Sequence, residues 1–96
     1  MAKLAIISDI HSNLEAAQVA MKFIDDQGIK PENILCLGDV IGYGPNPVEC
    51  VDIALHFRFN LLGNHEEAVI NGAFGFNPTA RRAIDWTRDQ LKAGGF

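Results

Sequence analysis

The chain has 96 residues, 48% of them hydrophobic, and a formal net charge of -4 at pH 7. This length and composition support one hydrophobic core but not two. The negative charge provides no broad basic surface for a nucleic-acid backbone, so we expect no specific nucleic-acid binding. The hydrophobic run at residues 4–7 is too short for a signal peptide or a membrane span, so we expect a cytoplasmic protein without membrane contact.

Three hydrophobic runs, each followed by a polar or glycine-rich turn, predict β-strands at residues 3–8, 34–37 and 59–62. The first two runs do not alternate with polar residues, which is typical of strands covered on both faces. Segments with helical spacing follow the runs. This alternation predicts the α/β class, with a βαβαβ-type parallel sheet and flanking helices.

Capping residues and hydrophobic spacing predict the helices. Asn46 and Asn77, each followed by proline, are the expected N-caps of two helices, the second of which ends at Gly94. A short helix is expected at residues 66–70. A crossover helix that stops at Gly28 is predicted by hydrophobic residues at helical spacing: Leu14, Ala17, Met21 and Ile24.

The two cysteines lie in predicted elements. Cys36 falls in the second strand and Cys50 in the helix after Asn46, without the Cys-x-x-Cys spacing of a redox or zinc motif. We interpret both as free, buried thiols that pack as small hydrophobic side chains.

A parallel sheet of three strands leaves at least one edge uncovered. The final helix ends at the last residues, with no further element predicted behind it. We therefore expect residues 1–96 to form a single, truncated domain. Its uncovered apolar surface could support self-association.

Polar side chains follow each predicted strand. Asp9 and His11 are two residues apart, so if the extended geometry persists both point to the same side and can share one ion. Asp39 follows the second strand and Asn64 the third, and right-handed crossovers place all four side chains along one edge of the sheet. This nitrogen and oxygen donor set suits manganese, iron, zinc, nickel or magnesium. Asp39 could bridge two ions.

His65 follows Asn64 and is expected on the substrate side of the ions. There it could protonate a leaving oxygen or stabilise a phosphoryl oxygen. Tyr43 and Asn46 could line the same pocket, but a loop anchor and a helix cap explain them equally well. Glycines flank these positions where the backbone must turn sharply: Gly38, Gly42, Gly44 and Gly63.

Three motifs in this order resemble those of the calcineurin-like metallophosphoesterase superfamily: Asp9-Ile10-His11, Gly38-Asp39-Val40-Ile41-Gly42 and Gly63-Asn64-His65-Glu66. Residues 38–47 and 76–87 are similar to its small bacterial and archaeal phosphodiesterase-type branch. The resemblance implies that the chain is the first half of a metallophosphoesterase α/β sandwich. It also implies a dinuclear metal centre that hydrolyses phosphate esters.

The resemblance assigns roles to residues. It implies that Asp9, His11 and Asp39 hold one divalent ion, and that Asp39 and Asn64 hold a second. It implies that His65 is the catalytic acid. The expected reaction is in-line attack of a metal-activated water on a phosphate-ester substrate, either a small molecule or a nucleotide.

The family pattern continues with a later histidine and a Gly-His-x-His motif, which these 96 residues lack. The remaining histidine, His56, falls in the second helix, where a surface role is expected. Glu66 stands where aspartate is more usual. We therefore expect the isolated chain to bind one ion loosely, or none, and to be weakly active.

Two function classes remain open. The chain is either part of a metal-dependent phosphoesterase or a non-catalytic fragment that serves as a metal-binding or protein-interaction module. Taken alone, Asp9 could be a helix cap and the glycines could simply make turns; three motifs at three successive strand ends favour a site. A dinucleotide-binding fold is disfavoured, because no Gly-x-Gly-x-x-Gly follows the first strand.

Overall fold

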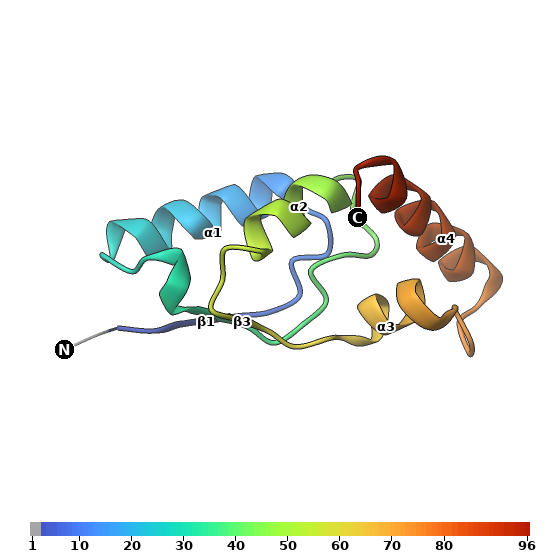
Figure 1. Cartoon of the computed structure of the whole chain (residues 1–96), viewed down its shortest axis with the longest axis horizontal. Coiled ribbons are helices and arrows are strands. Elements are labelled where there is room, and N and C mark those ends of the chain that lie inside the picture. The colour runs from blue at the N-terminus through green and yellow to red at the C-terminus, as the bar shows by residue number, and fades with distance from the viewer. Residues whose placement is uncertain (1–2) are drawn as a thin grey trace.

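The computed structural model describes residues 3–96. Three strands form one parallel sheet in the order β1-β2-β3, so the predicted α/β class and βαβαβ sheet are confirmed (Figure 1). The elements are β1 (Ala5–Ile7), α1 (Leu14–Asp26), the 3-10 turn η1 (Pro31–Asn33), β2 (Ile34–Cys36), α2 (Pro47–Ala54), β3 (Phe59–Asn60), α3 (Asn64–Asn71) and α4 (Pro78–Ala93). The strands are shorter than the hydrophobic runs that predicted them, since regular pairing between the strands is limited to these residues.

One face of the sheet is covered by α1 and α2 (Figure 1). The buried cluster joins side chains of both helices to those of β2 and of the loop that follows it. Removing such apolar surface from water stabilises the fold by roughly 25 cal/mol per Å². Both cysteines are fully buried free thiols in this cluster, as predicted. The main buried members are Ala17, Ile24, Ile34, Cys36, Val40, Ile41, Cys50 and Ala54.

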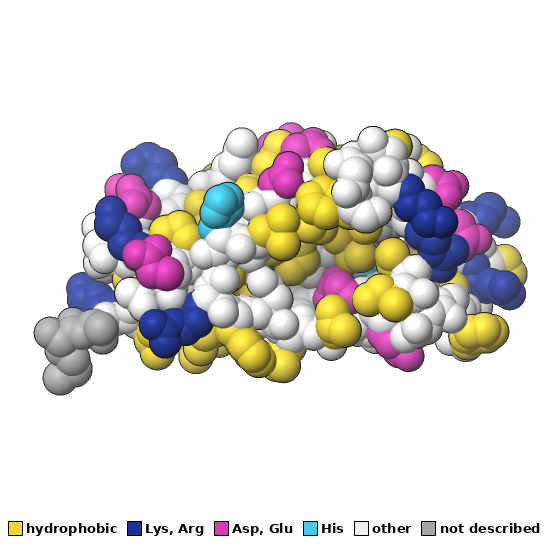
Figure 2. Space-filling model, viewed as in Figure 1, with side chains coloured by type: hydrophobic (Ala, Val, Ile, Leu, Met, Phe, Trp, Pro, Cys, Tyr) yellow, Lys and Arg dark blue, Asp and Glu magenta, His cyan; other side chains and the backbone are white. Residues whose placement is uncertain are grey.

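The other face of the sheet is bare in the described part of the chain. Ile6 pairs in register with Leu35, and Leu35 with Phe59, so these side chains share one face. Ile6 is 64% exposed and Phe59 51%, and hydrophobic side chains protrude along the lower border of Figure 2. The prediction that the first two strands are covered on both faces is therefore wrong for residues 3–96. A hydrophobic run shows that both faces are apolar, but not what covers them.

Helices α3 and α4 form a hairpin at one end of the sheet, and α4 also packs against α2 (Figure 1). Asn77 caps α4 by accepting a hydrogen bond from the Ala80 N–H, as its position predicted. Asn46 occupies the N-cap position of α2, but its side chain donates to Glu49 Oε2 instead of accepting from the helix backbone. No helix among residues 3–96 has the length and hydropathy to cross a membrane.

Candidate metal centre

The loops after β1 and β2 run side by side beyond the ends of their strands. The N–H of Asp9 donates to the carbonyl of Gly38 at 3.0 Å, and that of His11 to Asp39 at 2.9 Å. The next pair continues this pattern, with Ser12 N–H donating to the Val40 carbonyl at 2.8 Å. These bonds bring the two loops, and the side chains that they carry, to one edge of the sheet.

The backbone of this edge is left-handed at several positions. Asp9 and His11 have φ values of 60° and 49°. The expectation that extended geometry persists through them is therefore wrong, because the loop bonds to the neighbouring loop rather than continuing the strand. Each such position costs a non-glycine residue about 1–2 kcal/mol, and such strain is concentrated at functional sites. Among residues 3–96, every positive-φ residue other than glycine lies in these two loops: Asp9, His11, Ser12, Asp39 and Tyr43.

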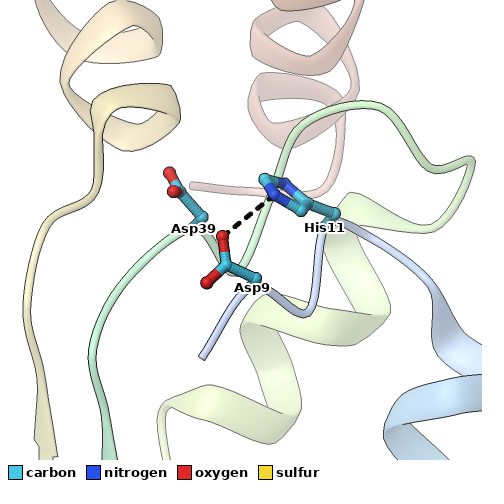
Figure 3. Close-up of side chains that lie close together, drawn as sticks. All are labelled: Asp9, His11 and Asp39. Atoms are coloured by element: carbon cyan, nitrogen blue, oxygen red, sulfur yellow. Dashed lines mark ion pairs between the residues drawn. The ribbon is translucent and has the colours of Figure 1, made fainter. Parts of the chain in front are cut away.

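The turn nevertheless brings three predicted ligands together (Figure 3). One potential ligand atom from each of Asp9, His11 and Asp39 lies within 4.8 Å of the others. His11 Nε2 is 3.3 Å from Asp9 Oδ1, and His11 Nδ1 is 3.1 Å from the Ile41 carbonyl oxygen. A carbonyl only accepts, so Nδ1 carries a hydrogen. Nε2 faces the carboxylates, where it can share a second hydrogen with Asp9 or, once that hydrogen is lost, offer its lone pair to a cation.

Asp9 is held in its charged form by its neighbours. The Ser8 hydroxyl donates to Asp9 Oδ2 at 2.6 Å. This bond lowers the pKa of Asp9 below its ordinary value, and the nearby His11 lowers it further. A carboxylate that is deprotonated at neutral pH is what a divalent cation requires as a ligand.

Asn64 lies against the carboxylate of Asp39. In its hydrogen-bonding orientation the Asn64 amide nitrogen donates to Asp39 Oδ2 at 3.1 Å and to Oδ1 at 3.2 Å. In the opposite orientation the amide oxygen faces both carboxylate oxygens, an arrangement that needs a cation between them. Asp39 Oδ1 also accepts from the His65 N–H at 3.0 Å, at the start of α3. The donor types and their convergence fit divalent cations.

His65 lies behind these groups, and only 3% of it is exposed. Its ring centroid is 4.9 Å from that of His11 and 4.5 Å from that of Tyr43. Burial lowers the pKa of His65, and so does the neighbouring His11. Among the described residues, no group hydrogen-bonds to His65 Nδ1. The ring is closely packed against Gly42, where a Cβ atom would collide with it.

An open cleft of about 670 Å³ lies beside this cluster. Asp9, His11 and Tyr43 contribute to its lining, together with one side of α1 at Ala16 and Ala20. A small molecule could therefore reach the candidate ligands from solvent. His56 is exposed and is not part of the cluster that the structure identifies.

The residues that support the ligands were missed by the sequence analysis. Ser8 directly precedes Asp9, and a hydroxyl beside a carboxylate is the signal that could have identified it. Glu66 stands three residues after Gly63, at capping-box spacing, and its Oε1 accepts from the Gly63 N–H at 2.8 Å. The Ile41 carbonyl that orients His11 has no signal in the sequence, because any residue could supply it.

Comparison with known proteins agrees with this geometry. The profile of the family described as calcineurin-like phosphoesterase matches residues 2–94. An uncharacterized protein of Methanocaldococcus jannaschii, MJ0912, is 42% identical over 92 residues, which are 93% of this chain and 37% of that protein. The serine/threonine-protein phosphatase PP1-delta of Caenorhabditis elegans is 29% identical over 93 residues, 88% of this chain and 30% of the phosphatase.

The chain thus spans about a third of the length of these curated relatives. The family match, by contrast, extends over nearly all of the chain and includes each of the three motifs at the sheet edge. The chain belongs to the calcineurin-like phosphoesterase family.

Proposed function

We propose that this chain takes part in the metal-dependent hydrolysis of phosphate esters. Asp9, His11 and Asp39 would hold a first divalent ion, and Asp39 with Asn64 would contribute to a second. The observation that carries the proposal is the approach of one ligand atom from each of the first three residues to within 4.8 Å, at the edge where the family motifs meet. Ions bound there would lower the pKa of a water molecule and polarise the phosphorus–oxygen bonds of the ester.

The chain's own groups orient the reaction. The Ile41 carbonyl fixes His11 with Nε2 on the side of Asp9 and Asp39, which would hold the ions. The N-terminus of α3, whose His65 N–H donates to Asp39, favours negative charge at the same point. The orientation of His11 favours a cation at Nε2, and the N-terminus of α3 favours an anionic ester beside it.

We propose His65 as the group that donates a proton or a hydrogen bond to the leaving oxygen. Its lowered pKa makes the imidazole mainly neutral near pH 7, so the negative charge of the ester is needed to favour the protonated form. Tyr43 lies against the His65 ring and is 70% exposed. A shift of the Tyr43 ring would give the substrate access to His65.

The same proposal includes the identity of the ion, the class of substrate and the location of the protein. We favour manganese as the ion and a diester as the substrate, either a small molecule or a nucleotide. We also favour a cytoplasmic location, because a chain with two free thiols suits a reducing compartment.

A second candidate function is a non-catalytic metal-binding or interaction module. The bare face of the sheet favours it, since Ile6, Leu35 and Phe59 form a row of apolar side chains that a second copy of the chain could cover. Light scattering tests self-association through this face. If the chain self-associates through this face, Ile6→Glu should lower the molar mass measured in solution. The control Val19→Glu changes an exposed residue of α1 and should leave that mass unchanged.

The hydrolysis proposal is tested with p-nitrophenyl phosphate and bis-p-nitrophenyl phosphate, with Mn²⁺ added. Asp39→Asn should lower the turnover number and the Mn²⁺ affinity by at least about 100-fold, because it removes the charge that both ions would share. The matched control is Asp52→Asn, an exposed carboxylate of α2. Equal activity of Asp39→Asn and the unaltered chain would contradict the proposal. Binding of Mn²⁺ without turnover would favour the metal-binding module.

A further inference from the structure

We infer that Glu66 is a positioning residue. It fixes the loop after β2, which carries Asp39, relative to the turn after β3, which leads into Asn64. The inference rests on the proposed function, because it concerns ions that Asp9, His11 and Asp39 would hold. Glu66 lies in the first turn of α3 and is partly buried. It is not among the candidate ligands, so its effect would be exerted through the backbone that carries them.

One carboxylate joins two loops that are far apart in the sequence. Glu66 Oε1 accepts from the Asp39 N–H at 2.6 Å and from the Gly63 N–H at 2.8 Å. Glu66 Oε2 accepts from the Ile41 N–H at 3.3 Å. Hydrogen bonds to a carboxylate are about twice as strong as those between neutral groups. The loop that carries Asp39 is thereby tied to the loop that carries Asn64.

The connection extends to a third candidate ligand. Ile41 donates its N–H to Glu66 and accepts the His11 Nδ1 hydrogen through its carbonyl. Glu66 therefore fixes the residue that orients the His11 ring. Groups that orient ligands in this way typically change metal affinity by about 10- to 100-fold when they are removed.

A capping role for Glu66 would not account for these contacts. A capping box explains only the bond to the Gly63 N–H, at the start of the residue's own helix. The bonds to Asp39 and Ile41 cross to another loop and have no part in capping α3. Asp39 has a φ of 56°, a left-handed conformation that is strained for a residue other than glycine, and the short bond to Glu66 helps to hold it there.

The experiment measures Mn²⁺ affinity from the electron paramagnetic resonance signal of the free ion. Glu66→Ala removes every acceptor and should weaken binding by about 10- to 100-fold. Glu66→Gln keeps the side-chain length and one acceptor oxygen, and should weaken binding less. If the carboxylate positions the loops, the Mn²⁺ affinity should therefore be highest in the unaltered chain, intermediate in Glu66→Gln and lowest in Glu66→Ala.

Two controls separate positioning from general stability. Glu67→Ala removes an exposed carboxylate from the same helical turn and should leave the affinity unchanged. Ile84→Val weakens the packing of a buried residue in α4 without touching the loops. Amide hydrogen exchange at Asp39 and Ile41 should be faster in both Glu66 variants than in Ile84→Val.

The outcomes are distinct. Mn²⁺ affinity within about twofold of the unaltered chain in Glu66→Ala would overturn the inference, because removing a residue that positions the ligands typically changes the affinity by about tenfold or more. Exchange at Asp39 and Ile41 no faster than in Ile84→Val would also overturn it. If the unaltered chain and Glu67→Ala bind no Mn²⁺, the proposed function fails. The exchange rates then still decide whether Glu66 fixes the two loops.

Discussion

The site edge, formed by residues 8–13 and 38–44, and the helical hairpin of α3 and α4 are stabilised by different kinds of contact. In the site edge, the bonds run between loops that are far apart in the sequence, and the backbone takes left-handed conformations. In the hairpin, Asn77 caps its own helix, and Arg88 forms the bonds between the two helices. The site edge therefore depends on backbone bonds between loops, and the hairpin on a local cap and on one side chain that links its two helices.

This difference shows where strain is tolerated in the chain. The left-handed residues lie beside the candidate ligands, where cross-loop hydrogen bonds and buried neighbours hold them. The hairpin has regular helices and ordinary caps. Substitutions in the site edge should therefore alter both stability and metal binding. Those in α4, and in α3 beyond its first turn with Asn64, His65 and Glu66, should alter stability alone.

The largest effect is expected for Gly42→Ala. Gly42 has a φ of 94°, and a Cβ atom there would collide with the buried His65 ring. Left-handed strain and overpacking together should lower the free energy of unfolding by about 2–4 kcal/mol. Urea denaturation measures this change.

The matched control for Gly42→Ala is Gly28→Ala. Gly28 also has a positive φ, 79°, but a Cβ atom there would meet nothing within 4 Å. In Gly28→Ala the backbone strain alone should lower the free energy of unfolding by about 1 kcal/mol. Equal losses in the two variants would show that the His65 ring can move aside, and that the site edge is loosely packed around Gly42.

Arg88→Met tests the hairpin. Arg88 Nε donates to the Val69 carbonyl at 2.7 Å, and one of its terminal nitrogens donates to the Ala68 carbonyl at 3.1 Å. Losing these bonds removes the Arg88 donors from both carbonyls and leaves Ala68 with the bond from the Gly72 N–H, so the free energy of unfolding should fall by about 2 kcal/mol. Arg82→Met, an exposed change on the same helix, should cost under about 0.5 kcal/mol.

Metal binding in the Arg88→Met variant tests the separation of the two regions. If they are independent, the Mn²⁺ affinity of Arg88→Met should match that of the unaltered chain. A loss as large as that expected for Glu66→Ala would show that α3 transmits changes from the hairpin to the site edge, and the comparison would then fail.

The sequence predicted the hairpin better than the geometry of the site edge. Asn77 and Gly94 mark the ends of α4 by rules that depend on a few neighbouring residues, and both ends were found. The left-handed turn at Asp9 and His11 was not found, because it depends on bonds to a loop some thirty residues away.

The candidate ligands could be named without this geometry. Parallel strands place the residues that follow them along one edge, whatever path the loops take. Asp9, His11 and Asp39 were therefore expected to lie together, and they do. An uncovered apolar surface of the three-stranded sheet was expected, but the hydrophobic runs did not show which face would be bare, since they do not reveal their neighbours. The role of Glu66 was missed because its partners are backbone amides.

A smaller effect is expected when two helix caps are compared. Asn77→Ala removes the acceptor for the Ala80 N–H and should destabilise the chain by about 1 kcal/mol. Asn46→Ala removes a side chain in the same position of α2 that makes no bond to the helix backbone. Its cost should be under about 0.5 kcal/mol. Equal costs in urea denaturation would show that Asn46 contributes to the site edge in another way.

The last effect is absent at neutral pH and concerns Cys50, which packs in the same buried cluster as Val40 and Ile41 of the site edge. Burial raises the pKa of its thiol to about 11 from an ordinary value of 9.0. Between these values the unfolded chain loses the proton while the folded chain keeps it, so the thiol's contribution to stability is full below pH 9 and is lost as pH rises toward 11. Urea denaturation at several pH values should show a steeper loss of stability in the unaltered chain than in Cys50→Ala. Parallel curves would mean that solvent reaches Cys50, and that the core beneath the site edge is open.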